Sequence, residues 1–182
     1  MSNTDGKALM DAGDPQFENL TQYDTAAEME AAAEQARARL RTTPRQTDPQ
    51  RGQRFFAEAQ TYIENLRLMA AGKQSTDSLT LLLGRISRTL VTIAEEGLDV
   101  EVFVAELRTL LPAVWAEDVR CQIEAVAAYD RGKVARVSLT SAMKHAHTTL
   151  MNAQRNNVDE AITLRLHAAL GQLRALLSTA VW

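Results

Sequence analysis

Residues 75–111 read STDSLTLLLGRISRTLVTIAEEGLDVEVFVAELRTLL, and this stretch decides the fold. Its first half places apolar residues at steps of three and four, which is the spacing of one face of an α-helix. Its second half repeats that spacing after a short polar break at residues 96–99. The apolar positions are Leu79, Leu82, Leu83, Ile86, Leu90, Ile93 and Ala94, then Val100, Phe103, Val104, Leu107, Leu110 and Leu111. The sequence therefore predicts two apolar helices that supply the main core.

The ends of these two helices carry recognisable signals. Ser75 or Thr76 is suited to cap the first helix, with its oxygen accepting a backbone N–H of the first turn. Gly97 is suited to close it in the left-handed conformation, and Asp99 to cap the second helix. Because so short a connection leaves little reach, we expect the two helices to be antiparallel neighbours.

The rest of the chain also predicts an all-α protein, since 182 residues contain only 8 glycines and 4 prolines and 46% of them are apolar. We expect a single bundle of about five to six core helices. Residues 51–182 form this bundle domain: helices at 51–71, from Pro112 to about Tyr129, 133–152 and about 157–180 join the central pair. In front of it we expect an extended acidic arm at 1–24, an additional N-terminal helix at 25–41 and a Pro-containing hinge at 42–50.

Several classes of protein are disfavoured by what the sequence lacks. No apolar run approaches the roughly 18 residues of a membrane span, and the first residues do not resemble a signal peptide. The single Cys121 suits a reducing compartment. These features predict a cytoplasmic protein without a membrane span, and a virion is the second location that we consider.

Charge is distributed in blocks along the chain. Residues 1–34 hold eight acidic residues and one lysine, a net charge of −7, whereas residues 35–56 hold six arginines and one aspartate, a net charge of +5. We call the arginines the basic block: Arg37, Arg39, Arg41, Arg45, Arg51 and Arg54. Their complementarity to the acidic arm predicts contact with an arm of the same or another copy. Contact with the phosphates of a nucleic acid and a merely solvated face are the alternatives.

The search for catalytic chemistry finds little. His145 and His147 lie on opposite sides of a predicted helix, and His167 stands alone with Glu160 two turns earlier. Nothing nearby in sequence activates Cys121 as a nucleophile. Phosphate-binding glycine loops are missing. We therefore predict no catalytic residues, no metal, no cofactor and no small-molecule substrate.

Apolar residues outside the core predict contacts with other chains. The composition of the arm favours disorder in isolation, and the alternative is that Phe17, Leu20 and Tyr23 anchor it onto a neighbouring surface. Met29 and Leu40 belong to the thin apolar face of the first helix. In the last helix, residues 162–180 follow a spacing of four and three that includes Leu166 and Leu173. That face is either buried in the bundle or forms a seam with another subunit. Trp182 adds a large apolar group beside it.

These features favour a non-enzymatic, self-associating structural protein, such as a shell, coat or assembly component, including that of a virus or phage. Its arm and first helix would reach a neighbouring subunit across the hinge, by domain swapping. The partner is then the protein itself or another protein. An adaptor or chaperone of a secretion or assembly machine is the alternative, and a nucleic-acid-binding structural protein that uses residues 37–54 is the third hypothesis.

Overall fold

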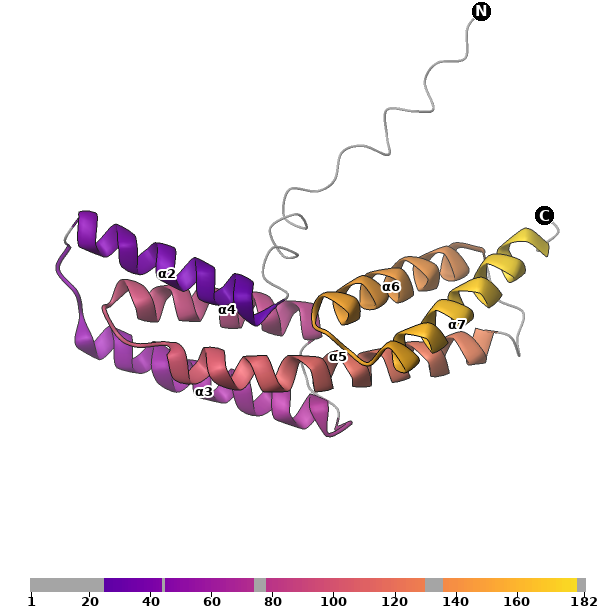
Figure 1. Ribbon diagram of the computed structural model, residues 1–182, viewed down its shortest axis with the longest axis horizontal. Coiled ribbons are helices and arrows are strands. Elements are labelled where there is room, and N and C mark those ends of the chain that lie inside the picture. Colours follow the sequence, from indigo (N-terminus) through magenta and orange to yellow (C-terminus); the bar gives the residue numbers. More distant parts are fainter. Residues whose placement is uncertain (1–24, 44, 74–77, 130–135, 180–182) are drawn as a thin grey trace, which may run out of the picture.

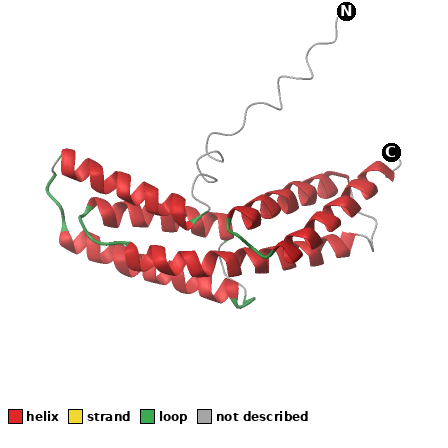
Figure 2. Ribbon diagram, viewed as in Figure 1, coloured by secondary structure: helices red, strands yellow, loops and turns green. Residues whose placement is uncertain are grey.

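The computed structural model describes residues 25–43, 45–73, 78–129 and 136–179. Within these ranges it contains six α-helices and no strand (Figure 2), which confirms the all-α prediction. They are α2 Ala26–Thr42, α3 Pro49–Ala70, α4 Leu79–Glu95, α5 Glu101–Tyr129, α6 Arg136–Arg155 and α7 Glu160–Thr179 (Figure 1). The predicted arm with Phe17, Leu20 and Tyr23 lies outside the described residues, as do residues 74–77 and Trp182.

Helix α5 runs through both halves of an elongated molecule (Figure 1). Its first half packs against α2 and α3, which also pack against α4, so these four helices form one bundle. Figure 1 shows α6 and α7 beside its second half, and these two helices also pack against each other and complete a three-helix bundle. The two halves therefore share one continuous helix.

The two helices encoded by residues 75–111 lie on opposite corners of the four-helix half. In the described chain, α4 and α5 each lie beside α2 and α3 and not beside each other, so the prediction that they are neighbours is wrong. Five residues, 96–100, connect them, and at about 3.3 Å per residue these can span a bundle diagonal. The diagonal arrangement lets each of the most apolar helices face two amphipathic ones.

The predicted helix boundary at Pro112 is also wrong, because α5 continues through this residue. A proline inside a helix removes one hydrogen bond and costs about 3 kcal/mol. The apolar face nevertheless continues across it, with Leu111, Val114 and Trp115 all at most 2% exposed. Burial on both sides of the proline offsets the lost hydrogen bond and keeps the helix unbroken.

The starts of two helices differ from those predicted. Ser78, not Ser75 or Thr76, is the N-cap of α4, and its Oγ accepts the N–H of Leu81 at 3.3 Å. Asn157 does not cap α7. It has a φ of 55° and closes α6, with the following N–H, that of Val158, bonded to the carbonyl of Ala153 at 3.0 Å.

Glycines close two other helices, and Gly97 is the one expected from the sequence. Gly97, with a φ of 80°, ends α4, and the N–H of Leu98 reaches back to the carbonyl of Ile93 at 3.1 Å. Gly72, with a φ of 71°, ends α3 in the same way. This pattern satisfies two of the carbonyls that a helix end otherwise leaves without partners.

The inner face of α7 is buried within the three-helix half. Leu166 and Leu173 are 0% exposed, and Ala169 and Leu170 lie beside them in the core. The sequence left open whether this face is buried in the bundle or forms a seam with another subunit, and in the structure it is buried in the bundle. Any contact of α7 with another molecule must therefore use its opposite face.

Candidate interaction site

The residues of the basic block gather where two connections lie against each other. Residues 43–48 join α2 to α3, residues 96–100 join α4 to α5, and each links opposite corners of the bundle at the same end (Figure 1). The N–H of Asp48 donates to a Glu96 carboxylate oxygen at 2.8 Å across them. Gly52 of α3 lies so close to the α4–α5 connection that an added Cβ would be 2.7 Å from Leu98 Cδ1.

Glu96 is the centre of this contact, because its side chain is only 2% exposed. Beyond the N–H of Asp48, its carboxylate meets Arg45 Nη2 at 3.1 Å and Arg51 Nη1 at 3.4 Å. Burying a carboxylate is costly unless charge and hydrogen bonds compensate for the lost water. Two guanidiniums and one amide supply that compensation, so Arg45 and Arg51 have an internal structural role.

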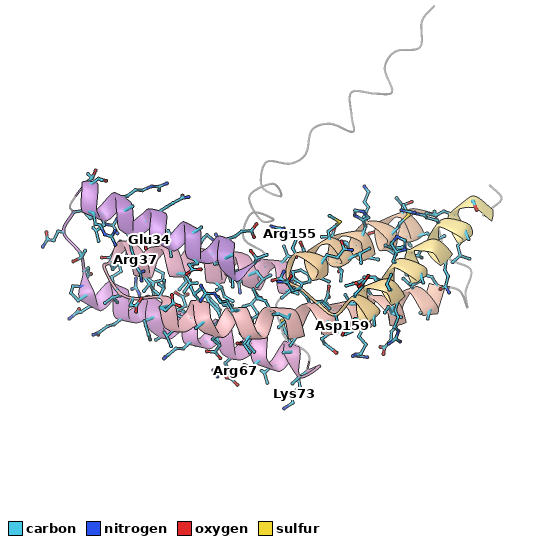
Figure 3. The ribbon with its side chains drawn as sticks, in the orientation of Figure 1. Glu34, Arg37, Arg67, Lys73, Arg155 and Asp159 are labelled. Atoms are coloured by element: carbon cyan, nitrogen blue, oxygen red, sulfur yellow. The ribbon has the colours of Figure 1, made fainter. Side chains whose placement is uncertain are left out.

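Arg37 and Arg41 also face carboxylates of the described chain. Arg37 Nη2 donates to Asp99 Oδ1 at 2.7 Å, and its Nη1 lies 3.5 Å from Glu34 (Figure 3). Arg41 lies 3.5 Å from the other oxygen of Glu34. The pKa of Asp99 is lowered, first by the N–H of Glu101 and then by the Arg37 guanidinium. The Arg37–Asp99 pair ties α2 to the start of α5.

The remaining members of the basic block are exposed. Arg54 lies over the ring of Phe55 at 5.5 Å, beside Arg51 at 5.8 Å. Arg39 lines a hollow of about 130 Å³ together with Leu40. Arg37, Arg41, Arg45 and Arg51 meet carboxylates that belong to α2, α4 and the α4–α5 connection. A contact of the basic block with the acidic arm or with phosphates stays a prediction.

The other end of α2 is held by a second pair of ionic contacts. Glu30 accepts from Arg108 of α5 at 2.6 Å and raises the pKa of that guanidinium, and Glu28 pairs with Arg155 of α6 (Figure 3). Thr25 and Glu28 form a capping box at the start of α2. Met29 of the thin face is 0% exposed, whereas Leu40 is half-buried.

The groups considered for catalysis do not assemble. Cys121 is exposed on α5, and its pKa is raised by partial burial and by Glu117, which disfavours the thiolate. His145, His147 and His167 are exposed. In the described ranges, no three histidine, cysteine, aspartate or glutamate side chains are placed to hold a metal ion.

Two buried polar contacts were missed from the sequence. Glu96 is one, and the other is Asp118, which accepts the Thr149 hydroxyl at 2.6 Å between α5 and α6. Burial raises the pKa of Asp118, and the Thr149 hydrogen bond opposes that shift. Asp118 follows the buried Val114 by four residues, so its place on an apolar face was a usable signal. Glu96 lies in a connection, where no periodicity marks burial.

Comparison with protein-family models, with curated proteins and with solved structures finds no match to this chain. Among the described helices, none combines the length and the apolarity needed to cross a lipid bilayer.

Proposed function

We propose that the protein is a non-enzymatic, self-associating helical structural protein, a shell, coat or assembly component, whose subunits exchange α2. The observation that carries this proposal is the way α2 is held. Its buried residues are Ala26, Met29, Ala33 and Ala36, so it contributes one large side chain to the core. Alanines bury little apolar area, and the burial energy of α2 is correspondingly small.

Ionic contacts supply much of what fixes α2. Its pairs with Asp99, Arg108 and Arg155 all involve partly exposed side chains. Such pairs each contribute little to stability and weaken as salt is added. Helix α2 can therefore leave its corner at a lower cost than a helix held by leucines and isoleucines.

A second copy offers an identical corner. The walls that α2 contacts are α4 and α5, and the same walls in another subunit accept the same helix with the same contacts. The connection at 43–48 is the segment that would open, since exchange of an element requires only that its linker change course. Residues 1–24 would travel with α2 to the neighbouring subunit.

An adaptor or chaperone is the second candidate. It is favoured by a hollow of about 440 Å³ between α3, α5 and α7. Five apolar and four charged residues line it: Ala70, Ala113, Ala116, Ile123 and Ile162, and Glu117, Arg120, Glu124 and Arg165. Nucleic-acid binding has the least support, because Arg37, Arg41, Arg45 and Arg51 lie beside carboxylates of the chain.

A mixing experiment tests the exchange of α2. One variant carries Glu30→Arg and a second carries Arg108→Glu, so each alone has like charges where the wild-type chain has an ion pair. In an exchanged heterodimer, the introduced guanidinium at position 30 faces the introduced carboxylate at position 108, and the unchanged Glu30 faces the unchanged Arg108. We expect mixing to produce heterodimers selectively, as measured by native mass spectrometry of differently labelled chains.

The control mixes Glu64→Arg with wild-type protein, because Glu64 pairs with Arg67 of its own helix. Exchange of α2 is contradicted if the complementary variants form no more heterodimer than this control pair. If light scattering shows that the full chain is a monomer at both low and high salt, self-association is excluded and the adaptor hypothesis is the one that remains.

A further inference from the structure

A hollow of about 250 Å³ lies where the end of α3 and the start of α4 meet the middle of α5. The described residues that line it come from these three helices and from the turn after α3. Met69, Leu79 and Val114, one from each helix, give it an apolar surface. An open hollow of this size with an apolar wall suits a small ligand that carries a short apolar chain.

Asp118 adds a carboxylate to this hollow, and only one of its two oxygens is used. Its Oδ2 accepts the Thr149 hydroxyl at 2.6 Å, and its Oδ1 has no hydrogen-bond partner among the described residues. In the described chain, the polar side-chain atom that is both fully buried and without a partner is Trp115 Nε1. Asp118 Oδ1 is therefore not sealed inside the core and can be reached from the hollow.

The charge of Asp118 is compensated less completely than that of Glu96. Glu96 meets two guanidiniums, whereas Asp118 has no ion pair with a described residue. Burial raises the pKa of Asp118, and the Thr149 hydroxyl and the charge of His145 oppose that shift without cancelling it. A bound cation would supply the compensation that the described chain leaves incomplete.

The other charged groups around the hollow leave Asp118 open to a ligand. Glu117 is occupied by Arg120, whose Nε lies 2.9 Å from Glu117 Oε2. The pKa of the Cys121 thiol is raised, so this side chain stays uncharged at neutral pH. Lys73 is exposed, makes no ion pair with Asp118 in the described chain, and is screened by the surrounding water.

We infer that this hollow binds a small organic ammonium ion with an apolar chain. The ammonium group donates to Asp118 Oδ1, and the chain lies on Met69, Leu79 and Val114. A hydrogen bond between two charged groups is stronger than one between neutral groups, and burial of the chain adds affinity. The described lining of this hollow includes no residue of α2, so the site does not depend on exchange of α2.

NMR of the methionine methyl groups in the full chain tests the site with two probes. Hexylamine carries an ammonium group at neutral pH, and hexanol has the same chain without the charge. We expect hexylamine to shift the Met69 signal saturably, with a Kd about tenfold lower than that of hexanol, because only the amine forms a charged contact with Asp118. Met151 is 46% exposed on α6, and its signal should not move.

The variant Asp118→Asn keeps an oxygen for the Thr149 hydroxyl but removes the charge. It should raise the Kd of hexylamine about tenfold and leave the Kd of hexanol unchanged. The matched control is Glu101→Gln, which removes an exposed charge about 25 Å away along α5 and should change neither Kd.

The inference is overturned if hexylamine does not shift the Met69 signal or binds no more tightly than hexanol. It is also overturned if Asp118→Asn binds hexylamine as tightly as the wild-type chain, or if Met151 responds as strongly as Met69. These readouts do not report the number of subunits, so this proposal and the exchange of α2 fail separately.

Discussion

Helices α2 and α4 occupy neighbouring positions in the same four-helix half, yet they are held by different forces. Helix α4 has nine buried residues, among them Leu82, Leu83, Ile86, Leu90 and Ile93, each 0% exposed. Helix α2 has four buried residues, three of them alanines, and contacts to charged partners at both ends. Apolar burial resists salt and pH changes, whereas partly exposed ion pairs do not. The comparison indicates that α2 is held less firmly than α4.

The largest effect is expected from a cavity in α4. Leu90→Ala should lower the free energy of unfolding by about 2–5 kcal/mol, because the side chain is fully buried and the space left behind cannot be filled. Denaturant unfolding followed by circular dichroism measures this change. Arg88→Ala on the exposed side of the same helix should stay within about 0.5 kcal/mol. A cost near that of the control would contradict the central role of α4.

A smaller effect is expected where the two connections meet. Glu96→Gln keeps the shape of the side chain but removes the charge that faces Arg45 and Arg51, and should cost about 1–3 kcal/mol. The neighbouring Glu95→Gln is the control, since Glu95 is 34% exposed and should contribute at most about 1 kcal/mol. Equal losses in the free energy of unfolding at the two positions would show that the burial of Glu96 does not strengthen its contacts.

Adding one methyl group tests how closely α3 approaches the α4–α5 connection. Gly52→Ala gains about 1 kcal/mol of helix propensity but places a Cβ 2.7 Å from Leu98 Cδ1 and 3.2 Å from Glu96 Cβ. Overpacking costs about 1–3 kcal/mol, so we expect a net loss of about 1 kcal/mol and a lower Tm. Gly171→Ala, with no described atom nearby, should instead raise Tm. A rise at both glycines would contradict the close approach.

The smallest effect is expected when the pH is lowered, which should weaken the contact between Arg37 of α2 and Asp99. The pKa of Asp99 is lowered in the folded chain by the N–H of Glu101 and by Arg37. Its contribution is therefore complete above the unfolded pKa of about 4 and is lost as the pH falls through the folded value. Hydrogen exchange of α2 amides should accelerate over that interval relative to α4 amides. An Asp99→Asn variant should lack this pH dependence, and an unchanged profile would exclude Asp99 as its source.

Periodicity in the sequence predicted most helices, because a helix that packs against the core needs an apolar residue at every third or fourth position. It did not predict that α4 and α5 lie diagonally, since an apolar face carries no information about which helix will cover it. Pro112 was misread because a local rule about proline was outweighed by burial of Leu111, Val114 and Trp115.

The candidate site was less predictable than the fold. The basic block was visible as a charge pattern, but its partner Glu96 is about fifty residues away in sequence and has no periodic neighbours. The two sides of α7 could not be told apart for another reason: leucines stand on both of them, with Leu164 58% exposed and Leu166 0% exposed. Exposure, which only the structure supplies, separates the two.

Helix α5 is about 44 Å long at 1.5 Å per residue, and Pro112 interrupts its hydrogen-bond ladder between the two bundles. The interruption lies where the two halves overlap along α5, because Leu79 of α4 reaches Val114 beyond it and Arg155 of α6 reaches back to Pro112. With buried residues on both sides of the proline, we expect the subunit to behave as one rigid rod of constant curvature. Small-angle scattering of Pro112→Ala should then show the same range of particle shapes as the wild-type chain.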